Sequence, residues 1–312
     1  MNRWYVGSIT MLLGAASYGI SGPFAKLAFR NGLSLGDLVP SLFFFSSLTF
    51  SIILLFNRRR FEGLTKKNVW QLAGMGASGL GATVCLYYFA ISQLPVSVAI
   101  VLLFQFAWIV PVIHIIVNRR WPNIFVILSL IFIVAGTILA VDLKWGFWRE
   151  GTILGYAAGV LSAFCYAIYL HYNAVIATNV SALTRSTIMT IGGLIVALIV
   201  YPPFFLFNGR LLDVGGWPIL SGIFNQVLPT ILMAIGIPMI GGVLSAIIGA
   251  IELPVSVLSS NFFLNEPITI AKWLGIALIL LGITVGSVLG YREVGKVRTK
   301  SKLKTAEISN KT

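Results

Sequence analysis

Two long stretches of this chain carry almost no charge, and they restrict its fold more than any other feature. Residues 68–118 contain no Asp, Glu, Lys or Arg, and residues 214–265 contain only Glu252. Each stretch is over 50 residues long, whereas about 20 apolar residues in a helix cross the hydrocarbon core of a bilayer. Each stretch must therefore fold back on itself inside a membrane.

The expected turns lie at Ser92–Pro95 and at Pro238–Gly242, because Pro and Gly are the residues that most readily end a helix. With these turns the sequence predicts an all-α integral membrane protein with ten transmembrane helices. Composition agrees, since only 10% of the residues are charged, against about 25% in soluble domains. The predicted spans are 6–29, 38–56, 70–92, 96–117, 124–141, 152–176, 186–207, 218–237, 241–264 and 268–290.

The net charge of +13 is explained by the ends of these spans, where basic residues set topology and contact anionic lipid. We therefore expect a lipid bilayer and no nucleic acid as its partner. Of the 22 Lys and Arg residues, 16 lie on the side of the N-terminus and 6 on the other side. This bias predicts a protein of the cytoplasmic membrane with both termini in the cytoplasm. Residues 292–312 are expected to form a basic, disordered cytoplasmic tail.

The two halves of the chain repeat a pattern of landmarks, and the first two prolines of each half are 16 positions apart. The landmarks are Pro95, Pro111, Pro122 and Gly136 in the first half, and Pro238, Pro254, Pro267 and Gly282 in the second. We predict two five-helix repeats, 1–145 and 146–291. Because five is an odd number, the second repeat enters the membrane from the opposite side, which is the inverted arrangement of many transporters.

Several short motifs are similar to a known family. They are Phe89–Ala99 (FAISQLPVSVA), Ile251–Ser256 (IELPVS), Leu264–Pro267 (LNEP), and Ser17–Gly19 followed by Lys26. Together they resemble the EamA-type members of the drug/metabolite transporter superfamily. The resemblance implies ten helices in two repeats and transport of small metabolites, commonly outward, including amino acids. The first half departs from the pattern, because Asn118–Pro122 lacks the Glu that many relatives carry before this Pro.

Glu252 is the strongest candidate for a functional residue. Of nine Asp and Glu residues it alone lies far from every predicted span end, and a charge at the bilayer centre costs about 2.5–3.5 kcal/mol on insertion scales. It could bind the ammonium group of a substrate or take up a proton that drives transport. The alternative is a buried, protonated carboxyl that hydrogen-bonds a neighbouring helix.

Other polar side chains inside predicted spans are candidates for substrate binding. Gln105 and Trp108, three residues apart and close to Pro111, share one helix face, and the pair faces either the substrate cavity or lipid. Tyr166, Tyr169 and Asn173 form a stripe that either lines water or holds helices together. The same alternatives apply to Asn225. The family resemblance adds Tyr18, and the helix-breaking prolines Pro95, Pro111, Pro238 and Pro254 complete the predicted site.

These features predict a secondary transporter that works by alternating access. No nucleotide-binding motif is present, which excludes a self-contained ATP-driven pump. An intramembrane enzyme would need a second acid or base beside Glu252, and a passive channel would need a ring of like charges or a carbonyl filter. His114, His171 and the two cysteines show no metal-binding spacing, so no cofactor or metal is expected. The substrate, a coupled proton or counter-substrate, and the oligomeric state are left open by the sequence.

Overall fold

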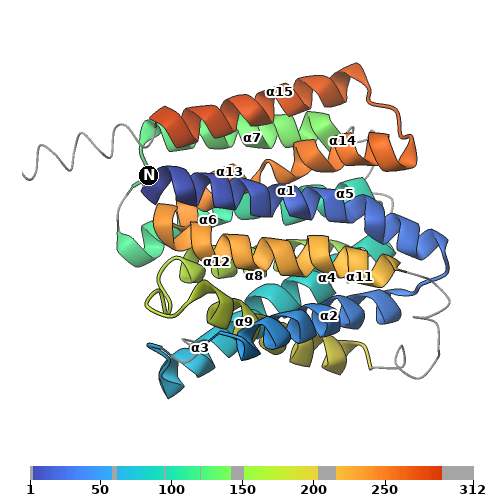
Figure 1. Cartoon of the computed structure of the whole chain (residues 1–312). Coiled ribbons are helices and arrows are strands. Elements are labelled where there is room, and N and C mark those ends of the chain that lie inside the picture. Colours follow the sequence, from blue (N-terminus) through green and yellow to red (C-terminus); the bar gives the residue numbers. More distant parts are fainter. Residues whose placement is uncertain are drawn as a thin grey trace, which may run out of the picture.

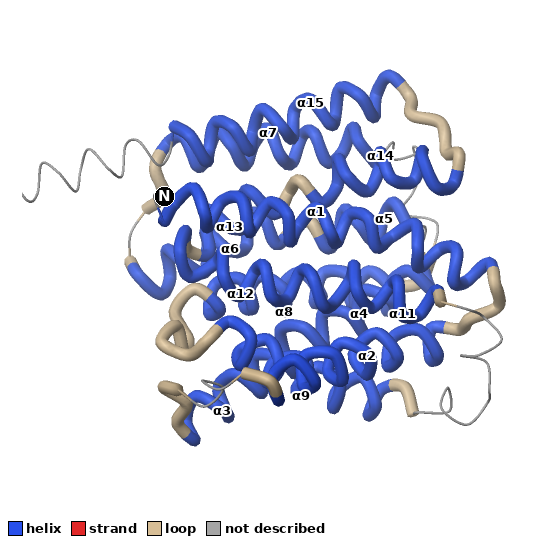
Figure 2. The backbone as a smooth tube through the Cα atoms, in the orientation of Figure 1, coloured by secondary structure: helices blue, strands red, loops and turns tan. Residues whose placement is uncertain are grey.

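The structure is a computed structural model, and it describes residues 3–57, 62–94, 96–119, 121–141, 151–202 and 216–289. Every regular element within these ranges is a helix (Figures 1 and 2). With η marking π-helical segments, the elements are α1 (Arg3–Arg30), α2 (Leu35–Leu55), α3 (Lys66–Met75), η1 (Gly76–Gly81), α4 (Ala82–Gln93), α5 (Val96–Leu103), α6 (Phe106–Asn118), α7 (Ile124–Val141), α8 (Ile153–Asn173), α9 (Ala182–Val200), α11 (Trp217–Gly222), η4 (Ile223–Val227), α12 (Leu228–Ile240), α13 (Gly242–Gly249), α14 (Glu252–Leu264), α15 (Ile270–Thr284) and η5 (Val285–Leu289).

Among the described residues, nine helical segments are long and apolar enough to cross a membrane. Helix α1 is not one of the nine, although its 28 residues would extend over about 40 Å. The prediction of ten spans is therefore confirmed in part. The described residues form nine such segments, and the remaining predicted span corresponds to this long, more polar helix.

The chain reverses direction within both charge-poor stretches. In the first, α4 ends at Gln93 and α5 begins at Val96, while Pro95 itself lies outside the described residues. In the second, Gly241 takes a φ of +86° between α12 and α13, a conformation that Gly adopts at no steric cost. Pro238 lies inside α12, so the turn is made by the glycine and not by the proline that we expected to break the helix.

Two membrane-crossing segments are broken near their middle. The first is interrupted at Phe104–Gln105, between α5 and α6, and the second at Ala250–Ile251, between α13 and α14. Pro254 is the third residue of α14, in the first turn, where its missing N–H leaves no hydrogen bond unmade. The prediction for Pro111 is wrong, because this residue lies inside α6 and the helix breaks before it.

Matching elements recur at one spacing along the chain. Helices α5 and α13 begin at residues 96 and 242, α6 and α14 begin at 106 and 252, and η1 and η4 end at 81 and 227, a difference of 146 each time. Arg119 and Asn265, which are also 146 apart, both adopt a left-handed conformation after their helices. Pro111 and Pro254 are only 143 apart, so they do not occupy matching positions as we predicted. The residue that matches Glu252 is Phe106.

Close helix contacts hold the bundle together. Helices α7 and α15 lie side by side (Figure 1), and a Cβ on Gly136 would come within 2.7 Å of the carbonyl oxygen of Gly275. The Ser129 hydroxyl donates a hydrogen bond of 2.7 Å to the carbonyl of Gly282. Helix α1 packs on both α12 and α14. Small residues therefore let helices from the two ends of the chain approach closely.

The structure places Arg185 differently from our prediction. Because the predicted span begins at residue 186, we counted Arg185 among the basic residues outside the membrane. Helix α9 begins at Ala182, and the Arg185 side chain is buried, with 2% exposed. Its Nη1 donates to the carbonyl of Ala234 at 2.9 Å, and its Nη2 donates to the carbonyl of Asn173 at 2.7 Å and to the Asn173 side-chain oxygen. These bonds connect α9 with α8 and α12. The predicted basic tail, 292–312, lies outside the described residues.

Candidate functional site

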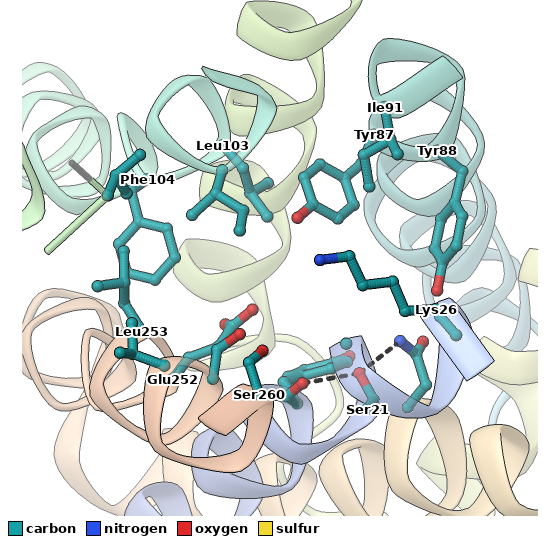
Figure 3. A pocket seen from close by; sticks show the side chains of 18 of the residues that line it. Ser21, Lys26, Tyr87, Tyr88, Ile91, Leu103, Phe104, Glu252, Leu253 and Ser260 are labelled. Carbon is teal, nitrogen blue, oxygen red and sulfur yellow. Dashed lines mark hydrogen bonds between the residues drawn. The ribbon is translucent and has the colours of Figure 1, made fainter. Parts of the chain in front are cut away.

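A cavity of about 520 Å³ lies between α1, α4, α8 and α14. Its wall combines apolar side chains with tyrosines, and Glu252 belongs to it (Figure 3). The cavity gathers residues from both halves of the sequence, from Tyr18 in α1 to Lys272 in α15. This size suits a small organic molecule rather than a bare ion.

Glu252 lies at the start of α14, directly after the break in the helix. Its carboxyl points into the cavity (Figure 3), whose wall also includes Tyr18, Tyr87 and Tyr166. The positive end of the α14 dipole favours a carboxylate here. Within the described ranges, no side chain or backbone group hydrogen-bonds Glu252, and no cation pairs with it. The hydrogen bond to a neighbouring helix that the alternative interpretation requires is thus absent among the described residues.

A glycine in α1 determines where Glu252 lies. A Cβ on Gly19 would come within 2.5 Å of the Glu252 carbonyl oxygen and 2.8 Å of the Cβ of Val255. Real Cβ atoms do not approach other atoms so closely, so only Gly allows α14 to begin against α1 at this point. The family-like motif Ser17–Gly19 thus contributes both a lining side chain, Tyr18, and this close contact.

Three further predicted residues line the cavity together with Glu252, namely Tyr18, Tyr166 and Asn225. The rings of Tyr18 and Tyr166 meet edge to face, with centroids 6.4 Å apart. Asn225 donates a hydrogen bond of 3.0 Å to the Ser21 hydroxyl, which donates in turn to the Tyr18 carbonyl at 2.7 Å. The π-helical segment η4, which holds Asn225, is thereby connected to α1 at the wall of the cavity.

The predicted stripe on α8 divides between two places. Tyr166 lines the cavity, whereas Tyr169 and Asn173 are fully buried and are absent from its wall. Asn173 accepts hydrogen bonds from Arg185, and Tyr169 stacks on Tyr166 at a centroid distance of 6.0 Å. The sequence left open whether this stripe lines a cavity or holds helices together. Tyr166 lines the cavity, whereas Asn173 connects α8 with α9.

Gln105 and Trp108 contact each other but do not line the cavity. Trp108 is 41% exposed and its indole donates to the Gln105 side-chain oxygen at 2.7 Å. The Gln105 amide donates to the carbonyl of Val101 at 2.9 Å, while the Gln105 backbone N–H is turned to Leu102 instead. The pair therefore satisfies a carbonyl that the break between α5 and α6 leaves without a regular helical partner.

An ion pair lies at the more exposed end of the cavity. The Lys26 Nζ is 2.5 Å from a carboxyl oxygen of Glu266, and the two side chains are 41% and 36% exposed. Nearby, the Lys272 Nζ is 3.5 Å from the carbonyl of Pro267. Both partners of the ion pair belong to family-like motifs, but nothing in the sequence pairs residues 240 positions apart. Tyr87 and Tyr88 also line the cavity and were missed, because a tyrosine pair in an apolar span is not distinctive.

Comparisons with known proteins agree with this architecture. The sequence profile of the EamA-like transporter family matches the chain twice, over residues 5–141 and 153–288. A solved crystal structure of another protein superposes with a TM-score of 0.69 at 15% identity, covering 93% of this chain and 98% of the other. At this identity the likeness shows a shared fold alone. No curated protein matches the sequence.

Proposed function

This chain belongs to the EamA-like transporter family and is a multi-pass membrane protein, and from that premise we propose that it is a secondary transporter of a small metabolite. The observation that carries the proposal is the Glu252 carboxyl, which faces a cavity and has no partner among the described residues. A charge in this position costs about 2.5–3.5 kcal/mol on insertion scales. A site of this kind is complete only when a bound solute or a proton neutralises the carboxylate.

The surroundings of Glu252 support a carrier. Transporters of many folds bind their substrates near the membrane midplane, at helices that are interrupted there, because the free ends of such helices offer polar groups in an apolar setting. Glu252 follows such an interruption, and it lies near the middle of the segment Gly242–Leu264. The same break exposes the positive end of the α14 dipole beside the carboxyl.

The recurrence at 146 residues supports two inverted five-helix repeats, 1–145 and 146–291. It relates α5, α6 and η1 to α13, α14 and η4. It also relates Gly136 to Gly282, and both glycines lie at the contact between α7 and α15. Two such halves can exchange conformations, which opens the cavity to each side of the membrane in turn.

The distribution of charge supports a direction. If both termini are cytoplasmic, as the excess of basic residues on that side favours, the part of α1 that holds Lys26 approaches the outer face. The cavity with its ion pair Lys26–Glu266 then opens outward. This is the state from which an exporter releases its substrate, so we place the protein in the cytoplasmic membrane as an exporter of an amino acid or a related compound.

The proposal is tested by a metabolite release screen. Cells producing the wild type, Glu252→Gln or Glu62→Gln are compared for compounds that accumulate in the medium. Glu62 is exposed and does not line the cavity, so its substitution removes a carboxylate elsewhere. We expect release by the wild type and the Glu62 variant, and none above background by the Glu252 variant at equal protein level. Identical profiles for all three and for cells without the protein would contradict the proposal.

A further inference from the structure

We propose that the substrate is a small organic cation with an apolar or aromatic body, bound by Glu252 and by the tyrosine rings around it. This inference rests on the proposed transport function. Among amino acids and related compounds, it selects amines that carry no carboxylate. It follows from three properties of the cavity: its charge, its aromatic wall and its size.

The balance of charge selects a cation. Four charged side chains line the cavity, and three of them gather at its exposed end. There Lys26 and Glu266 neutralise each other at 2.5 Å, and Lys272 reaches the Pro267 carbonyl on the exposed surface, where solvent screens its charge. Among these four, Glu252 is the side chain for which the described part of the chain provides neither a hydrogen bond nor an ion pair. An anion would bring a carboxylate toward Glu252 without a cation there to compensate. The carboxylate of a zwitterion would have to reach Lys26 or Lys272 at the exposed end, where Glu266 already pairs with Lys26 and solvent screens Lys272.

The wall around Glu252 suits a cation for a second reason. Tyr18, Tyr87 and Tyr166 line the cavity together with Glu252, and the Tyr87 hydroxyl points into the same space (Figure 3). Aromatic rings attract cations through the negative charge of their faces, and the attraction grows when water is excluded. Three tyrosines beside one carboxylate therefore favour an ammonium group over a neutral hydrogen-bond donor.

The remaining wall requires an apolar body. It is formed by side chains such as Leu103, Phe104 and Leu253, whose surfaces face the cavity (Figure 3). An inorganic cation would fill little of the 520 Å³, and a polyol would leave this apolar surface in contact with polar groups. A ligand with a hydrocarbon or aromatic portion buries that surface and gains affinity from doing so.

The test uses four probes that share a phenyl group and differ in charge. They are phenethylamine, a cation, phenylalanine, a zwitterion, 3-phenylpropanoate, an anion, and 2-phenylethanol, which is neutral. Binding is measured by calorimetry on the full-length protein in lipid nanodiscs. We expect phenethylamine to bind at least about tenfold more tightly than the other three, the ratio expected for one charge-assisted contact.

Matched variants assign the binding to this site. Glu252→Gln should weaken phenethylamine binding about tenfold or more, while Glu62→Gln should bind as the wild type does. Tyr87→Phe keeps the ring and should retain most of the affinity, whereas Tyr87→Leu should lose it. Equal affinity in the Phe and Leu variants would show that the rings do not hold the cation and would overturn this part of the proposal.

The outcomes separate the substrate class from the transport function. Phenylalanine that binds as tightly as phenethylamine, or phenethylamine that fails to bind, overturns the cation assignment. Flux of phenylalanine in proteoliposomes alongside either result leaves the transporter standing. Conversely, binding of phenethylamine that depends on Glu252, without flux of any probe across the vesicle membrane, supports the cation site and overturns the transport function.

Discussion

Arg185 and Glu252 both lie in the first turn of a helix inside the protein, yet their surroundings are opposite. Arg185 donates to two backbone carbonyls, those of Asn173 and Ala234, and lines no part of the cavity. Glu252 faces the cavity, and no described residue hydrogen-bonds it. The helix dipole opposes the first charge and favours the second. A cation that hydrogen-bonds two other helices holds the fold together, whereas a carboxyl without such bonds is available to a solute.

The largest loss of stability is expected when Arg185 is replaced. Replacement by Ala leaves the carbonyls of Asn173 and Ala234 without their donor and separates α9 from α8 and α12. Each buried acceptor that loses its donor costs about 1–3 kcal/mol. Thermal unfolding of the detergent-extracted protein should show a large loss of stability for Arg185→Ala and a smaller one for Arg185→Lys. A stable Ala variant would mean that Arg185 is not a structural residue.

Substitution of Glu252 is expected to leave the stability unchanged or to raise it, in contrast to substitution of Arg185. Glu252→Gln replaces a carboxyl that no described residue hydrogen-bonds or pairs with, so the fold should be unchanged or more stable, by up to about 1–3 kcal/mol. The same unfolding experiment measures this, with Glu62→Gln as the control. A clear loss of stability would remove the contrast with Arg185, because it would show that the fold depends on the carboxyl.

Gly19 tests whether the position of Glu252 depends on the contact between α1 and α14. In Gly19→Ala the new Cβ would meet the Glu252 carbonyl at 2.5 Å, so one helix must shift, at a cost of about 1–3 kcal/mol. We expect weaker phenethylamine binding as well as lower stability. Gly74→Ala is the control, since a Cβ there has no atom within 4 Å. Unchanged binding in Gly19→Ala would show that the site tolerates the shift.

The smallest effect on stability is expected at the ion pair of Lys26 and Glu266. Its side chains are 41% and 36% exposed, so solvent weakens the attraction, and a pair of this kind contributes about 0–1 kcal/mol. A double-mutant cycle with Lys26→Gln and Glu266→Gln on the free energy of unfolding measures the coupling. A coupling well above this range would place the pair with Arg185, as a contact that holds the fold together.

The sequence predicted half of the candidate site well. Glu252, Tyr18, Tyr166 and Asn225 line one cavity, although their roles in binding stay predictions. Gln105, Trp108, Tyr169 and Asn173 lie elsewhere. Spacing along a helix shows which residues share a face, and this was right for the contact of Gln105 with Trp108. It does not show what that face meets, which depends on how the helix is rotated within the bundle.

Hydrophobicity and its interruptions, which are local properties of the chain, were enough to establish the membrane class, the helical fold, both reversals and the one acid far from any span end. Tertiary structure alone decided the burial of Arg185 and the pairing of Lys26 with Glu266. The physical reason is that each of these depends on packing between helices distant in sequence. Close approach at residues such as Gly19 sets that packing, and no pattern within a single helix records it.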